Sequence, residues 1–177
     1  MNEFTEILQS ATASVEGSYF LLRIDGGSPI PRERIYCYEL YHQMRLRWPI
    51  RSPYILNGEL DKRAHPILRD LGIDNVTPDF LVHTPGSMDG NFAVIEVKNT
   101  ISPRGVQKDL DTLDRFVRKA GYKRAIYLLY GREATDHGLS RIKEIAAERQ
   151  SLEPMEIWIH PEERKSARRW GIGICNS

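Results

Sequence analysis

Residues 78–98 read PDFLVHTPGSMDGNFAVIEVK, and this stretch predicts a β-hairpin that brings two carboxylates together. Two apolar, strand-like runs flank residues 84–91, which contain the proline and the glycines typical of a loop. If that loop closes a symmetric hairpin, Asp79 lies directly opposite Glu96 on the same face of the sheet. Lys98 is two residues beyond Glu96 and shares its face, because side chains alternate along a strand. A slip of one residue in the register would separate the two acids.

A pair of carboxylates in this arrangement is typical of a binding site for a divalent cation. Two close carboxylates repel each other and raise one pKa unless a cation lies between them. Mg²⁺ suits the arrangement, because it takes one or two carboxylates together with water and substrate phosphate oxygens. A lysine on the same face can orient or help to deprotonate an attacking water and can balance charge on the phosphate. This is the equipment for metal-assisted hydrolysis of a phosphodiester.

The pattern Pro78-Asp79, a spacer of 16 residues and Glu96-Val97-Lys98 resembles the PD-(D/E)xK motif of the restriction-endonuclease-like nuclease superfamily. The stretch from about 55 to 130 is also similar to small bacterial members of that superfamily. The resemblance implies a Mg-dependent endodeoxyribonuclease that uses Mg²⁺ or Mn²⁺ and acts on DNA in defence, repair or mobile-element processing. It further implies that Asp79, Glu96 and the Val97 carbonyl hold the metal and that Lys98 positions or activates the attacking water.

In that superfamily an upstream helix often offers a further acidic residue, and Glu39 on the helix predicted over 32–47 matches this place. The alternative for Glu39 is a structural pair with an arginine of the same region, namely Arg32, Arg45 or Arg47.

The resemblance also implies that polar residues of the helix after the motif contact DNA, and Arg104, Gln107 and Lys108 occupy that position. The alternative is an ordinary solvated helix surface. Glu59 and Asp61 share a strand face and offer another ligand pair, or else are charges that flank a turn. His83 has the strand parity of Asp79 and either lines the cleft or is a partly buried histidine with a structural partner.

Apolar periodicity along the rest of the chain predicts an α/β fold with a central mixed β-sheet flanked by helices. The resemblance implies that this fold has a restriction-endonuclease-like core. We expect one domain, 1–177, with the motif core at about 32–130. The helix 32–47 carries an apolar stripe of Ile35, Tyr38, His42 and Leu46. The other expected helices cover 1–16, about 62–71, 103–120 and 138–149, and the expected strands cover 19–24, 54–56, 59–61, 79–83, 92–98, 125–130 and 155–159, before a polar tail.

Composition excludes several classes of protein. Lys and Arg number 25 against 24 Asp and Glu, a net charge of +1, which excludes a strongly basic nucleic-acid coat. The acidic segment 64–99, with net charge −3, lies between basic segments 32–63 (+3) and 100–177 (+4). No run approaches the roughly 18 apolar residues of a membrane span, so no membrane partner is expected. The two cysteines form no CxxC pattern, which excludes a disulfide scaffold and favours the cytoplasm.

Three other functions remain open at this stage. The same fold could serve as a catalytically silent DNA-binding module, or as a nuclease subunit that is active only with a partner. Because no separate recognition domain is visible, sequence choice would then come from a homodimer or a larger nuclease complex. A small-molecule enzyme built on β/α units is the third alternative, and neither a phosphate-binding loop nor a nucleophile elbow supports it.

Overall fold

The computed structural model describes residues 2–58, 70–73, 76–149 and 151–172. A six-stranded sheet forms its centre, in the order β1-β2-β3-β4-β5-β6. Strands β3, β4 and β5 run parallel, and the pairs β1–β2, β2–β3 and β5–β6 are antiparallel, so the sheet is mixed as expected. The elements are α1 (Asn2–Thr12), α2 (Gly17–Phe20), α3 (Glu33–Leu46), β1 (Ile55–Asn57), β2 (Phe80–His83), β3 (Asn91–Lys98), α5 (Pro103–Ala120), β4 (Arg124–Tyr130), α6 (Asp136–Ala147), β5 (Glu156–His160) and β6 (Arg168–Ile172).

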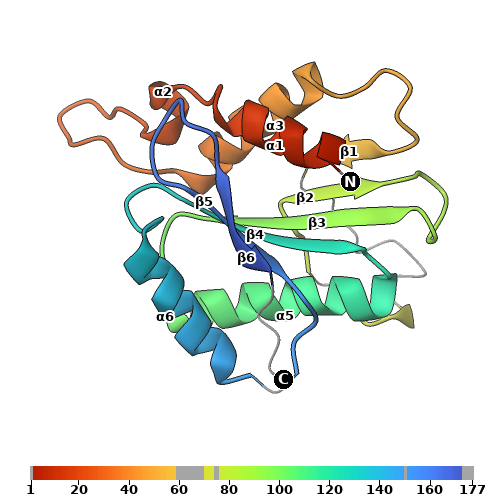
Figure 1. Ribbon diagram of the computed structural model, residues 1–177. Helices are drawn as coiled ribbons and strands as arrows, with labels where there is room; N and C mark the ends of the chain where they lie inside the picture. Colours follow the sequence, from red (N-terminus) through yellow and green to blue (C-terminus); the bar gives the residue numbers. More distant parts are fainter. Residues whose placement is uncertain (1, 59–69, 74–75, 150, 173–177) are drawn as a thin grey trace.

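Helices cover both faces of the sheet. Helices α1, α2 and α3 lie on one face, and α5 and α6 lie on the other (Figure 1). Each face has its own hydrophobic core, and the strands supply alternate residues to the two cores. Along β3, Val94 packs on the α5 side while Ile95 and Val97 pack on the α3 side. Since Glu96 shares the parity of Val94, the strand directs its carboxyl towards α5.

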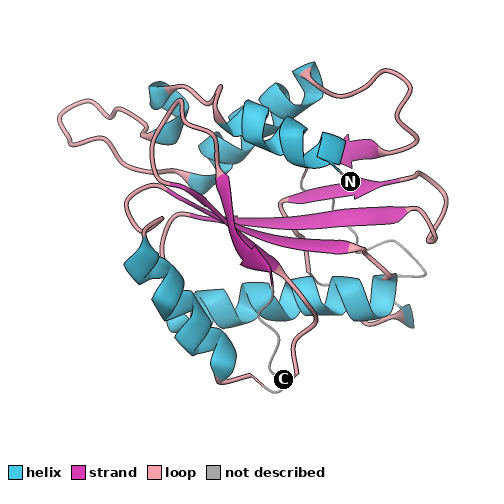
Figure 2. Cartoon of the chain, viewed as in Figure 1, coloured by secondary structure: helices cyan, strands magenta, loops and turns pink. Residues whose placement is uncertain are grey.

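The helix after the motif begins and ends at residues that its sequence marks clearly. The Ser102 hydroxyl caps the first turn of α5 by accepting from the Gly105 N–H, and Pro103 occupies a position where a helix needs no amide donor. At the other end Gly121 has φ +70°, a left-handed conformation that glycine adopts without strain. The observed helix matches the predicted range of 103–120. It runs along the sheet next to the carboxyl end of β3 (Figure 2).

Three expectations differ from the structure. Residues 19–24 do not form a strand: they comprise the end of α2 and a loop with a single bridge between Leu22 and Ile30. The polar tail contains the additional strand β6. On α3, the face that packs against the sheet is Tyr36, Leu40 and Met44, whereas Tyr38, His42 and Leu46 of the predicted stripe are exposed.

Two short predicted elements fall on residues that the structure does not describe. The predicted strand 59–61 lies outside the described residues, as does nearly all of the predicted helix 62–71. Within the described part of the chain, no helix is long and apolar enough to span a membrane.

Candidate active site

From Phe80 to Val82 the hairpin has the register that the sequence predicted, and the register shifts by one residue between Val82 and His83. Phe80 pairs with Ile95 and Leu81 with Val94, which places Asp79, one residue before β2, opposite Glu96. The two carboxyl groups lie close enough that each one influences the pKa of the other. The other contact of Asp79 is with the backbone, because its Oδ2 accepts from the Val97 N–H at 2.7 Å. The first acid of the motif is therefore fixed against the strand that carries the second.

Lys98 connects this pair to the two neighbouring helices. Its Nζ lies 2.9 Å from Glu33 Oε1 at the start of α3, and 3.7 Å from Asp109 Oδ2 on α5. The ammonium group is thus held between two carboxylates that come from opposite sides of the sheet. Asp109 is buried, and its Oδ2 has no hydrogen-bond partner among the described residues.

Burial dominates the electrostatics of the acids. It raises the pKa of Glu96 well above its usual range, and the nearby Asp79 and Asp109 carboxylates raise it further. Burial also raises the pKa of Asp79, although Lys98 and the Val97 amide offset part of the effect. The pKa of Asp109 rises to about 6 for the same reason.

The pKa of Lys98 rises even though the residue is largely buried. Desolvation alone would lower its pKa, but the carboxylates of Asp109, Asp79 and Glu33 outweigh it and raise the pKa. Lys98 therefore remains an ammonium ion at neutral pH. Four carboxyl groups, those of Asp109, Asp79, Glu33 and Glu96, act on the Lys98 ammonium, and Lys108 also lowers the pKa of Asp109.

These groups line a cavity of about 600 Å³ between α3 and α5. An adjoining hollow of about 270 Å³ shares Val76, Lys108 and Thr112 with it and continues along the outer side of α5. The cavity is lined by Glu33, Arg34, Cys37, Tyr38, Tyr41, Gly58, Val76, Thr77, Asp79, Phe80, Glu96, Lys98, Lys108, Asp109 and Thr112.

The cavity also contains a thiol. Burial raises the pKa of Cys37 well above its usual range, and the carboxylates of Asp79 and Glu33 add to the effect. The thiol stays protonated at neutral pH, which excludes it as a nucleophile because the thiolate is the reactive form.

The donor set suits a hard divalent cation. In the described part of the chain, no group of three or more His, Cys, Asp and Glu side chains is arranged to hold a metal ion. Asp79 and Glu96 supply two carboxylates, the number that Mg²⁺ commonly takes from a protein while it keeps water or substrate oxygens as its other ligands. A cation between them would also relieve the repulsion by which the Asp79 carboxylate raises the pKa of Glu96. The residues therefore fit Mg²⁺ or Mn²⁺.

The structure does not bring Glu39 to the cavity. Glu39 is buried on another side of α3, where its Oε1 accepts from Gln43 at 2.7 Å. Gln43 in turn accepts from Arg47, which donates to Ser10 on α1. Glu39 thus belongs to a chain of hydrogen bonds that connects α3 to α1. This is close to the alternative expected from the sequence, a structural pair with Arg47, except that Gln43 lies between the two residues. The acid that α3 directs into the cavity is Glu33.

Sequence reasoning missed Glu33 and Asp109. A signal for Asp109 exists: it shares the core-facing side of α5 with Val106, Leu113 and Phe116. An acidic residue at such a position breaks the apolar pattern, as Glu96 does within its strand. Glu33 stands in the first turn of a helix, where an acid is common, so nothing in the sequence sets it apart.

The other candidate residues are distributed as follows. Lys108 lines both the cavity and the adjoining hollow, whereas Arg104 and Gln107 line the hollow alone. The Gln107 amide donates to Glu148 at 3.1 Å. His83 does not line the cavity and shares a hydrogen bond with Asn57 at 2.8 Å. Glu59 and Asp61 lie outside the described residues.

Fold and site together define an α/β protein with a mixed six-stranded sheet and a buried carboxylate–lysine cluster. No family model matches the sequence. A search of curated proteins likewise gives no match. A structural comparison finds SfsA of Pyrococcus furiosus in complex with Ca²⁺, at 12% identity over 86% of this chain and 74% of that chain, with a TM-score of 0.35. A similarity this low assigns no function.

Proposed function

We propose that this protein is a divalent-metal-dependent nuclease that hydrolyses phosphodiester bonds of DNA. One observation carries the proposal: the hairpin register sets Asp79 opposite Glu96, with Lys98 on the same face and all three in one cavity. Buried acids without a fully compensating partner are costly to a fold, which is a reason to look for a function at this cluster.

Each residue of the cluster has a role in this reaction. Asp79 and Glu96, with the Val97 carbonyl, would hold Mg²⁺ or Mn²⁺. When bound, the cation neutralises the carboxylates and polarises a phosphate oxygen. Lys98 remains protonated, so it donates hydrogen bonds that orient the attacking water and offset charge on the phosphate. Glu33 and Asp109 hold the Lys98 ammonium in position from α3 and α5.

The hollow beside the cavity provides a path for the DNA backbone. Arg104, Lys108, Arg115 and Arg149 line it together with Gln107 and Asp111, and Asp111 forms an ion pair with Arg149. Cationic side chains therefore outnumber the acid along this side of α5. Contacts to phosphate oxygens fix a protein on DNA without reading its sequence. The overall charge of +1 is compatible with this path, because four carboxyl groups lie in the cavity and Arg34 and Lys108 line it together with Lys98.

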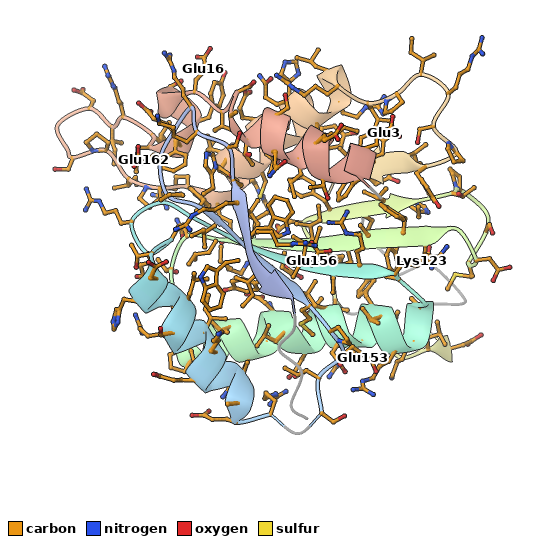
Figure 3. All side chains as sticks on the ribbon, in the orientation of Figure 1. Glu3, Glu16, Lys123, Glu153, Glu156 and Glu162 are labelled. Carbon is orange, nitrogen blue, oxygen red and sulfur yellow. The ribbon has the colours of Figure 1, made fainter. Side chains whose placement is uncertain are left out.

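The direct test is cleavage of supercoiled plasmid DNA by the purified protein in Mg²⁺, in Mn²⁺ and in EDTA. We expect nicking or cutting only with metal, and a loss of about 100-fold or more in Glu96→Gln and in Lys98→Ala. Glu144→Gln and Lys123→Ala are matched controls, since both residues are exposed. Glu144 lies on α6, and Lys123 precedes β4 at the end of the sheet opposite Lys98 (Figure 3).

Two outcomes would contradict the proposal in different ways. Cleavage that survives both site substitutions would remove the cluster from the reaction. DNA binding without cleavage in any divalent metal, and with no metal-induced rise in melting temperature, would identify a catalytically silent module. Cleavage that appears only with a co-purifying partner would instead identify a nuclease subunit that depends on that partner.

A further inference from the structure

Two tyrosines of α3 form part of the cavity wall together with Glu33 and Cys37 of the same helix. Tyr38 is 62% exposed, and Tyr41, three residues later, is half-buried. The Tyr41 hydroxyl donates to the Leu56 carbonyl at 3.3 Å, and its ring lies nearly parallel to that of Phe80. Residues three apart are neighbours on one side of a helix. Tyr41 is therefore held in place from behind, while Tyr38 presents its ring to solvent at the mouth of the cavity.

The position of the two tyrosine rings in the cavity, rather than their exposure, indicates a role in binding substrate. Single exposed aromatic residues are ordinary on protein surfaces. Here both tyrosines line the same cavity as Asp79, Glu96 and Lys98. A substrate phosphate that reaches the acids would have its adjoining nucleotides beside the tyrosine rings.

Cations lie on both sides of the rings. Arg34 is one helical turn before Tyr38 on α3, and Lys108 lines the wall that α5 contributes. A groove that combines cations with aromatic rings is the arrangement by which proteins bind single-stranded nucleic acid, through backbone contacts and base stacking. The cavity volume of about 600 Å³ is of the size that holds a small-molecule ligand, and so is ample for one base and its phosphodiester.

We propose that Tyr38, supported by Tyr41, stacks on an unpaired nucleobase next to the scissile phosphate, so that the substrate is a DNA strand with unpaired bases at the cut. In an intact duplex the faces of each base are covered by its neighbours, and a tyrosine ring on a helix surface has no base face to contact. A single strand, a flap or an overhang supplies one. This inference rests on the proposed nuclease function and specifies its substrate class.

The first experiment compares cleavage of one labelled oligonucleotide as a single strand and as a perfect duplex, in Mn²⁺. We expect the wild type to cut the single strand faster and Tyr38→Ala to cut it about 5- to 100-fold more slowly, the range that loss of one stacked base produces. Tyr38→Phe keeps the ring and should restore the rate. Tyr19→Ala is the matched control, because Tyr19 is also exposed but lies outside the cavity.

The second experiment measures stacking without cleavage. In a Glu96→Gln background with Mg²⁺, a single strand that contains 2-aminopurine should lose fluorescence on binding, and Tyr38→Ala should abolish that quenching. Melting temperatures of both variants check that they are folded. Tyr41→Ala should weaken the quenching less, because its ring is partly covered by Phe80.

The outcomes separate this inference from the proposed function. If DNA is cut but Tyr38→Ala changes neither the single-strand rate nor the quenching, the stacking site is refuted and the nuclease stands. Faster cutting of the duplex by the wild type also refutes it. If no DNA is cut yet the quenching depends on Tyr38, the nuclease proposal fails and the stacking site stands.

Discussion

Replacing Asp109 with asparagine is expected to stabilise the metal-free protein at pH 7. The carboxyl group is buried on the sheet side of α5, and its Oδ2 has no hydrogen-bond partner among the described residues. Its ion-pair partner, Lys98, is 3.7 Å away and shared with Glu33. The ionised side chain therefore loses more from desolvation than it gains from Lys98, which is why the pKa of Asp109 rises from 3.8 to about 6.

The size of the effect follows from that rise. One pH unit corresponds to 1.36 kcal/mol, so a rise of about two units costs the ionised native state about 3 kcal/mol at pH 7. In Asp109→Asn the neutral amide no longer pairs with the Lys98 ammonium, and this loss offsets part of the stabilisation. We therefore expect the free energy of unfolding at pH 7 to increase by about 1–3 kcal/mol. For a chain of this length, 1 kcal/mol changes the melting temperature by roughly 2–4 °C.

The pH dependence has a definite sign. Since the native pKa of Asp109 is raised, the folded protein binds this proton more tightly than the unfolded chain does. The contribution of Asp109 to the free energy of unfolding of the wild type should therefore increase as the pH falls from 7 through 6 towards the unfolded value near 4. The advantage of Asp109→Asn over the wild type should shrink over the same range.

Thermal melts in EDTA at pH 7 and pH 5.5 measure both effects, with the exposed Asp70→Asn as the control. Two results would refute the reasoning. One is a lower melting temperature for Asp109→Asn than for the wild type at pH 7. The other is an Asp109→Asn advantage that is as large at pH 5.5 as at pH 7.

Two further predictions concern α3. Glu33→Gln should slow cleavage more than Glu39→Gln does, because Glu33 contacts Lys98 whereas Glu39 contacts Gln43; rates on plasmid DNA measure this, and a larger loss with Glu39→Gln would return that residue to the site. In a Cys175→Ser background, Cys37 should react with a thiol reagent at pH 7 far more slowly in the folded protein than in denaturant, since it is buried with a raised pKa. Immediate labelling of the folded protein would contradict this.

The sequence was sufficient wherever local pattern alone decides the structure. Away from the loop, Phe80–Val82 pair with Ala93–Ile95 in the register that a symmetric hairpin gives, so the pairing of Asp79 with Glu96 followed from counting residues, although the register shifts by one residue between Val82 and His83. The Ser102 cap and Gly121 fixed both ends of α5. Glu96 stood out because an acid occupies a strand position where apolar residues are expected, and the structure buries it.

The contact between Asp109 and Lys98 is an example of a feature that local sequence patterns do not predict. Its place among apolar residues of α5 marks it as unusual, but the residue that makes it part of the site, Lys98, belongs to a strand. Contact between them depends on how α5 packs on the sheet, and that packing involves both hydrophobic and polar residues distant in sequence. The sequence alone therefore marks Asp109 as an unusual acid on an apolar helix face, but it does not identify Lys98 as its partner.

The error over Glu39 and the error over the apolar stripe have one cause, the rotation of α3 about its axis. This helix has two apolar rows, and Tyr36, Leu40 and Met44 face the sheet in place of the row that contains Tyr38 and Leu46. Glu33 and Glu39 are six residues apart, which is about 120° around a helix, so only one of them can face the cavity. The rotation that buries Tyr36 directs Glu33 inward. The same rotation leaves Tyr38 unused by the core and exposed at the cavity mouth, which is where a substrate would meet it.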